Sequence, residues 1–262
     1  MALRFEKKTR SDGGWGNNHL ILLAQNFTGY KNLMKLVTAG YLEGFYYRPR
    51  IDMDLLREYS EGLICMSACL KGVVPEKMLK GDYEGARKEA LLFSEIFQDR
   101  YYLEIQNHGI PEEEQNLKNM KKLSQDLNLP LVCTNDAHYA KKEHWEAHDI
   151  HICLGTGKER SDPNRLRYAT PEFYFKTQDE MHKLFKEFPG AIENTRKIAD
   201  SIDITLPIGE SHLPNFPIPK EANTSDPDEY LKSITESGAQ NLYGEITCLL
   251  YTSDAADERL SV

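Results

Sequence analysis

Three short apolar runs, at 62–67, 101–106 and 131–133, constrain the fold of this 262-residue chain more than any other feature of its sequence. Runs of this length, bounded by polar and turn-forming residues, are typical of strands buried on both faces of a sheet. The stretches between them, 82–98 and 111–129, carry apolar residues at helical spacing. Because strands that alternate with helices need crossover connections, the sequence predicts a parallel α/β arrangement.

An earlier apolar run at 19–25 predicts one more fully buried strand, followed by a helix with its N-cap at Thr28 and its end near Gly44. Later helices are predicted at 141–154, 180–188 and 191–202. The buried faces of the two long early helices are predicted from their apolar spacing: Leu33, Leu36, Val37 and Tyr41 in the first, and Ala86, Ala90, Leu91, Phe93 and Phe97 in the second.

Each of the three opening runs is followed by side chains that can bind a metal ion. Cys69 follows the first run, His108 the second, and Asp136 and His138 the third. These side chains are expected to converge, because the carboxyl ends of parallel strands meet at one edge of a sheet. A carboxylate oxygen and a neutral imidazole suit Zn, Mn or Fe. The alternative is a turn that caps the last strand, with His138 as a surface residue; the repetition at three strand ends favours a site.

Two weaker patterns involve aromatic and basic residues. The segment 46–50 places two tyrosines beside Arg48 and Arg50, a combination that can stack on bases and hold phosphates. The alternative is a loop packed by its own tyrosines. His144 and His148 lie four residues apart, but the Glu of the zinc motif His-Glu-x-x-His is missing. A helix-packing role is the preferred interpretation of that pair.

Composition narrows the class of protein. The formal net charge of −9 at pH 7 argues against a nonspecific polyanion binder, because phosphate affinity needs clustered Lys and Arg. It does not argue against a site in which metal ions supply the positive charge. No apolar run approaches the length of a membrane span, and no signal-peptide pattern opens the chain. The five cysteines lack Cys-x-x-Cys spacing, which indicates a reducing, cytoplasmic setting.

The C-terminal part of the sequence changes in character. The stretch 206–219 is rich in proline and is typical of an extended connector at a domain boundary. A new helix is predicted after Asp226 and the proline that follows it. Residues 248–262 do not continue the pattern of that helix; they resemble translated read-through of a sequencing adapter, which indicates a non-native tail.

Six motifs occur in one order along the chain: Asn18-His-Leu-Ile-Leu-Leu-Ala-Gln, Gly44-Phe-Tyr-Tyr-Arg-Pro-Arg-Ile-Asp, Ser67-Ala-Cys-Leu-Lys-Gly, Tyr102-Leu-Glu-Ile-Gln-Asn-His-Gly, Thr134-Asn-Asp-Ala-His-Tyr and Ser211-His-Leu-Pro-Asn-Phe-Pro. Over about 4–247 the sequence resembles the N-terminal region of the bacterial replicative DNA polymerase III alpha subunits. The resemblance implies a polymerase and histidinol phosphatase (PHP) domain at 1–205, a proline-rich connector at 206–229, and the start of the palm region at 230–247. The family's PHP domain is a distorted (β/α)7 barrel with a metal cluster at its strand ends.

The resemblance assigns metal ligation to Cys69, His108, Asp136 and His138, and the presence of all four suggests the version of the domain that keeps its metals. The family begins with a His-x-His motif, an Asp-His pair and a Glu, which this sequence lacks. We therefore expect a barrel without its first strands, about half a metal shell, unpaired strand edges and marginal solubility. The palm carboxylates are missing too, so the chain is not expected to polymerise DNA.

The function that the resemblance implies is that of a fragment of a DNA-directed DNA polymerase, whose PHP domain acts in the intact protein as a metal-dependent 3′-5′ exonuclease. Zn or Mn is implied at the PHP site and Mg for polymerisation. The implied partners are primer-template DNA, a proofreading exonuclease subunit and a sliding clamp, without a membrane. One alternative is a degenerate PHP domain that serves as a structural platform. Another is a stand-alone phosphoesterase, against which the polymerase-like connector argues.

Overall fold

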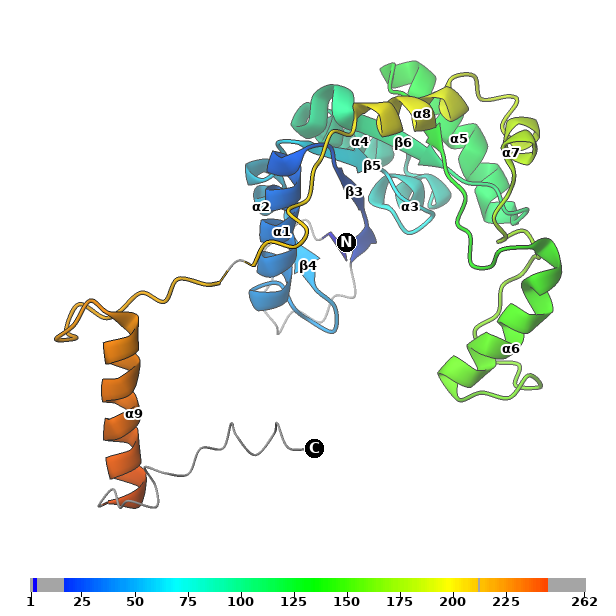
Figure 1. Ribbon diagram of the computed structural model, residues 1–262. Coiled ribbons are helices and arrows are strands. Elements are labelled where there is room, and N and C mark those ends of the chain that lie inside the picture. Colours follow the sequence, from blue (N-terminus) through cyan, green and yellow to red (C-terminus); the bar gives the residue numbers. More distant parts are fainter. Residues whose placement is uncertain (1, 4–16, 212, 245–262) are drawn as a thin grey trace. The chain divides into compact units, whose positions relative to one another are not determined.

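A computed structural model describes residues 2–3, 17–211 and 213–244 (Figure 1). The chain divides into two compact units, Met1–Leu206 and Pro207–Val262. The proline-rich stretch predicted as a connector begins at this division. The proposed foreign tail at 248–262 lies outside the described residues.

The first unit is built on a sheet of four strands in the order β3 (Ile21–Ala24), β5 (Leu63–Met66), β6 (Tyr101–Ile105) and β7 (Leu131–Cys133). The last three strands are parallel, which confirms the predicted α/β class. Helix α4 (Tyr83–Phe97) connects β5 to β6, and helix α5 (Pro111–Leu127) connects β6 to β7. The three loops that carry the candidate ligands therefore follow the carboxyl ends of parallel strands, as the sequence predicts.

Strand β3 departs from the prediction of a fully buried parallel strand. It runs antiparallel to β5, with Ile21 opposite Met66, and its residues are only half-buried. The two strands are antiparallel because β5 begins beside the end of β3. There, the Gln25 N–H donates to the carbonyl of Gly62 at 2.8 Å. The chain between them passes through two helices and returns to the same end of the sheet. An edge position with one paired side explains the partial burial.

A second, small sheet pairs three short strands in the order β2 (Asn18–His19), β1 (Ala2–Leu3) and β4 (Arg50–Ile51). Strand β1 is antiparallel to β2 and parallel to β4. The remaining helical elements are α1 (Phe27–Leu42), α2 (Met53–Glu58), α3 (Val73–Leu79), η1 (Gln98–Arg100), η2 (Lys142–His144), α6 (Trp145–Thr156), α7 (Gln178–Leu184), α8 (Ala191–Ser201) and α9 (Pro227–Tyr243).

Helix α1 packs through only part of the predicted face. Its N-cap is Asn26, whose side chain accepts from the Gly29 N–H at 2.9 Å, and not Thr28. Leu36 is fully buried and Leu33 packs against the core, as predicted. Val37 and Tyr41, also predicted to be buried, are 42% and 58% exposed. The helix also approaches the residue before β5 so closely that a Cβ at Gly29 would lie 1.8 Å from the Gly62 oxygen, so the absence of a side chain permits this contact.

The core lies between the sheet and the helices α4 and α5. Phe93 and Phe97 of α4 are fully buried, and Phe93 stacks against Tyr101 of β6 with ring centroids 5.5 Å apart. The predicted buried face of α4 is correct except for Leu91, which is 42% exposed because it lies off the stripe formed by the two phenylalanines. Helix α8 packs on β7, and helix α3, which was not predicted, packs on α4 (Figure 1).

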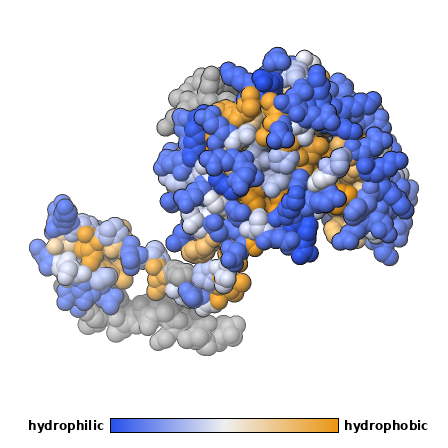
Figure 2. Space-filling model, turned by 90° about the horizontal axis from the view of Figure 1, so that it is seen from above, coloured by the Kyte–Doolittle hydropathy of each residue, from blue (hydrophilic) through white to orange (hydrophobic). Residues whose placement is uncertain are grey.

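In the second unit, α9 follows an N-cap at Asp226, at the predicted place. Its apolar residues Leu231, Ile234 and Leu242 are exposed, and Figure 2 shows hydrophobic patches among hydrophilic residues on the surface. Among the described residues, no helix is both long and apolar enough to cross a membrane.

Candidate metal centre at the strand ends

The loops after β6 and β7 connect three of the four predicted ligands through pairwise contacts. The Asp136 N–H donates to Nε2 of His108 at 3.3 Å, and Oδ2 of Asp136 lies 3.3 Å from Nε2 of His138. His108 is buried, whereas Asp136 and His138 are exposed. The site therefore has a fixed floor, His108, and an open side formed by Asp136 and His138.

Glu113, in the first turn of α5, fixes the orientation of His108. Its carboxylate accepts from the His108 backbone N–H at 2.5 Å and lies 2.9 Å from Nδ1 of the same residue. Glu113 is itself buried. This hydrogen-bond pattern assigns the ring proton to Nδ1, so Nε2 is the free acceptor, as the contact from the Asp136 N–H also requires. A carboxylate that holds the far nitrogen of an imidazole is a frequent support of metal-binding histidines.

A segment distant in sequence, residues 168–177, lies across these loops, and we call it the strap. Its residue Phe173 stacks on the His108 ring at a centroid distance of 4.3 Å and an angle of 5°. The Phe173 carbonyl accepts from the His138 N–H at 2.7 Å. The Tyr168 hydroxyl lies 3.1 Å from Nε2 of His138. The strap thus contacts both histidines of the site.

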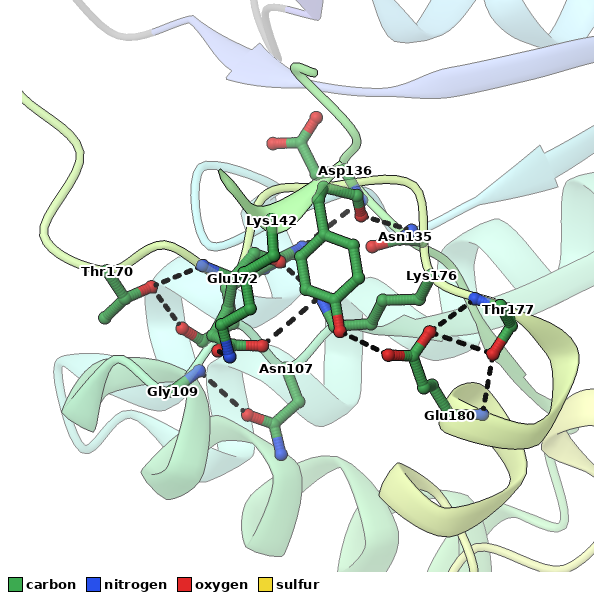
Figure 3. Close-up of polar contacts among 12 residues, drawn as sticks. Asn107, Gly109, Asn135, Asp136, Lys142, Thr170, Glu172, Lys176, Thr177 and Glu180 are labelled. Carbon is green, nitrogen blue, oxygen red and sulfur yellow. Dashed lines mark hydrogen bonds and ion pairs between the residues drawn. The ribbon is translucent and has the colours of Figure 1, made fainter. Parts of the chain in front are cut away.

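Polar contacts hold the strap in place (Figure 3). Thr170 donates to the His108 carbonyl at 2.6 Å, and the Asn135 side chain donates to the Tyr174 carbonyl at 2.9 Å. The Tyr174 hydroxyl donates to Glu180 of α7 at 2.6 Å, which raises the pKa of Tyr174 to about 12. Lys176 is buried beside Glu172, and this burial lowers the pKa of the Lys176 ammonium.

The fourth predicted ligand, Cys69, lies beside His19, which the sequence prediction missed. Its Sγ is 3.4 Å from Nδ1 of His19, at the end of β2. Ala68 turns the chain here with a φ of +65°, a conformation that non-glycine residues seldom adopt away from functional turns. Burial lowers the pKa of His19, and the charge of Asp136 acts in the opposite direction. His19 is the first residue of the run predicted as a strand. Because β3 is antiparallel to β5, its beginning lies at the same end of the sheet as the carboxyl end of β5.

Glu104 is a second residue that the sequence prediction missed, although a charge inside the apolar run 101–106 marks it. It is 2% exposed on β6, and its Oε1 accepts from the Thr134 hydroxyl at 2.5 Å. Its Oε2 has no hydrogen-bond partner among the described residues. Burial raises the pKa of this carboxyl.

The donor types fit a divalent metal, but their arrangement forms pairs. Within 2–3, 17–211 and 213–244, no three His, Cys, Asp or Glu side chains lie together in a way that could hold a metal ion. Thiolate and imidazole in one pair, and carboxylate and imidazole in the other, are ligand types that Zn and Mn accept. His148 belongs to neither pair: its ring packs 5.8 Å from His138 and 5.1 Å from Tyr139 by centroids.

The two arginines predicted to contact nucleic acid differ in their surroundings. Arg48 is exposed. Arg50 is 7% exposed, donates through Nε to the Gly44 carbonyl at 3.2 Å, and stacks over the Tyr46 ring at 5.2 Å. Arg48 is therefore the member of the pair that faces solvent.

Residues 2–108 match the PHP domain. The α/β fold, with its candidate ligands at the strand ends, agrees with this match. The chain belongs to the family of DNA polymerase III alpha subunits. It is 46% identical over 258 residues to the DNA polymerase III subunit alpha of Borreliella burgdorferi. The aligned stretch covers 97% of this chain and 22% of that protein. It is 38% identical over 246 residues to the protein of the same name from Thermus aquaticus, covering 92% of this chain and 20% of that protein. The chain thus spans about a fifth of the length of these relatives.

Proposed function

We propose that the chain forms part of a replicative DNA-directed DNA polymerase, in which its PHP domain hydrolyses a phosphodiester at a mismatched 3′ end with the help of divalent metal ions. The observation that supports this best is the orientation of His108: Glu113 holds Nδ1, so Nε2 is the acceptor nitrogen and faces the Asp136 backbone N–H at 3.3 Å. A carboxylate that orients the ring in this way is a frequent support of metal-binding histidines, and a metal ion at Nε2 would replace the contact with that N–H. The similarity to the alpha subunits supports the polymerase context.

In this proposal, Cys69, His108, Asp136 and His138 bind Zn or Mn, and His19 joins them through its contact with Cys69. The metal ions would supply an activated water and would stabilise the leaving oxygen. None of the four residues acts as a general base independently of the metal. Phe173 covers the His108 ring, and Arg48 contacts the DNA backbone.

The proposal extends to the setting of the whole protein. There, Mg serves polymerisation, and the partners are primer-template DNA, a proofreading exonuclease subunit and a sliding clamp in the cytoplasm.

A second candidate function is a structural platform for the polymerase core and for a separate proofreading subunit. The observation that favours it is the absence of a three-residue metal group within the described ranges. The two functions differ in one measurable property, which is metal content.

The test is the metal content of the purified chain beside Asp136→Asn and His138→Ala, measured by elemental analysis. We expect stoichiometric Zn or Mn in the unchanged chain and its loss in both variants. Asp54→Asn and His182→Ala are matched controls, because both residues are exposed and lie outside the site; they should retain the metal. A folded chain without metal, even after incubation with Zn or Mn, contradicts the hydrolytic proposal and favours the platform.

A further inference from the structure

A hollow of about 130 Å³ lies on α6 and on the loop that follows it, apart from the candidate metal centre. It is lined by Trp145, Glu146, Asp149, Arg160, Arg165 and Arg167. Three guanidinium groups thus face two carboxylates, so the lining carries a net charge of +1 (three minus two). In a chain with a formal net charge of −9, a positive hollow is a departure from the overall balance.

The floor of the hollow is a fixed ion pair. Arg165 donates to Asp149 through both of its terminal nitrogens, at 2.6 and 2.8 Å, and the two side chains are 5% and 9% exposed. These hydrogen bonds lower the pKa of Asp149. A bidentate pair of this kind holds the loop on the helix. Asp149 neutralises the charge of Arg165, so the positive charge available to a ligand in the hollow comes from the other two arginines.

Arg160 and Arg167 retain most of their donors. Arg160 is 56% exposed and forms long ion pairs with Asp149 and Glu146, at 3.5 Å in each case, of which the one with Glu146 is also a hydrogen bond. Arg167 has no ion pair or hydrogen bond with any residue in the described part of the chain, although its charge acts on Asp149. Because a guanidinium has five N–H donors in a planar fork, two such groups can bind a phosphate from two sides.

The two segments that line the hollow, α6 and residues 160–167, each include or adjoin a residue that contacts His138 of the candidate metal centre. Asp149 follows His148, whose ring packs against His138. Arg167 precedes Tyr168, whose hydroxyl lies 3.1 Å from His138. The residues that line the hollow are therefore neighbours in the chain of residues that contact His138.

We propose that this hollow binds a phosphate of single-stranded DNA through Arg160 and Arg167, with a base stacked on Trp145. Arginine forks and indole faces are the groups that bind single strands without sequence preference. The inference rests on the proposed function, since it takes its substrate from there. Its role is to hold the strand beside the site where the terminal phosphodiester is cut.

The test uses the fluorescence of Trp145. The sequence has two tryptophans, so Trp15→Phe leaves Trp145 as the only one. The chain is titrated with a short oligothymidylate in the presence of a chelator. We expect a saturable change in emission, and a loss of affinity of about tenfold in Arg160→Ala and in Arg167→Ala. Glu146→Gln should tighten binding, because it removes a negative charge from the hollow.

Arg196→Ala is the matched control, since Arg196 is 81% exposed on α8 and away from the hollow; its affinity should not change. Circular dichroism checks that each variant is folded. No change in emission with a folded chain overturns the proposal, as does a change that survives both arginine variants. Equal affinity for inorganic phosphate and for the oligonucleotide overturns the assignment to DNA.

The binding test fails or succeeds independently of the proposed function. It is carried out in the presence of a chelator, so its result does not depend on whether Asp136 and His138 bind a metal ion. Loss of metal binding with intact DNA binding contradicts only the hydrolytic proposal. Intact metal binding without DNA binding contradicts only the site on α6.

Discussion

Glu113, on the first turn of α5, orients His108 through both of its carboxylate oxygens. A buried carboxylate is costly unless it is paired and hydrogen-bonded, and here both oxygens are used on one residue, His108. The contact stabilises α5 at its N-terminus, where a negative charge is favourable. It also selects the tautomer of the histidine. Stability and the readiness to bind metal are therefore coupled at one side chain.

Glu113→Ala should lower the free energy of unfolding by about 1–3 kcal/mol, because it leaves the buried His108 N–H groups without acceptors. It should also weaken Zn or Mn binding by about 10–100-fold. Denaturant unfolding and metal titration measure the two effects. Glu114→Ala is the matched control, since Glu114 is exposed on the same turn. An unchanged metal affinity in a folded Glu113→Ala chain would show that the tautomer is set in another way.

The position of the four candidate ligands after strands could be predicted from the sequence, because strand ends are visible in the apolar pattern. The contacts that orient them could not. Phe173 reaches His108 from 65 residues away in the chain, a separation that the pattern does not encode. His19 joined the site only because the edge strand β3 is antiparallel, and one sequence gives no signal for the direction of an edge strand.

At the scale of elements, the N-terminal cap of α7 depends on the negative charge of Glu180. Thr177 and Glu180 form a capping box, in which each side chain bonds to the backbone of the other. Glu180 also accepts from the Tyr174 hydroxyl of the strap. These hydrogen bonds hold the pKa of Glu180 at about 2, well below its usual value of 4.5. The cap thereby connects the helix to the segment that covers His108.

The pKa of Glu180 is lower in the folded chain than in the unfolded one, so its stabilising effect is complete above pH 4.5 and is lost as the pH falls towards 2. Glu180→Gln keeps the shape but removes the charge. The variant should be less stable than the unchanged chain at pH 6, and the difference should vanish near pH 2. Unfolding by urea across this range measures it. Glu187→Gln, at an exposed position, should show no such convergence.

Helix α1 shows why burial was harder to predict than helix position. Of its apolar residues at 33, 36, 37 and 41, the first two pack in the core as their spacing predicts, but the last two are exposed. The closest approach of the helix backbone, beside β5, is made through Gly29. A glycine face packs because it lets two backbones approach, which is a property of the partner surface as well as of the helix. Hydropathy alone cannot report that partner. By contrast, the face of α4 was predicted well because large side chains fill a sheet-facing core.

At the scale of the whole molecule, the core of the first unit ends before the proline-rich stretch. Among the described residues, the buried hydrophobic side chains extend no further along the chain than Ile198 in α8. That helix is tied to the sheet by Asn194, which donates to the Leu131 carbonyl of β7 at 2.7 Å. The Asp203 N–H then donates to the Gln25 carbonyl at 2.8 Å, next to β3. The last contacts of the first unit with its own sheet are therefore made before residue 206.

A chain shortened to end at Leu206 should keep the thermal unfolding transition of the first unit, because none of the buried contacts just described is removed. A chain shortened to end at Gly190 loses α8, with the buried Ala191 and Ile198 and the hydrogen bond of Asn194 to β7. It should unfold well below the longer chain or fail to fold, since removal of buried apolar groups costs about 25 cal/mol per Å² exposed. Circular dichroism melting of the two shortened chains separates these outcomes. A transition lowered equally in both would mean that the second unit contributes to the stability of the first.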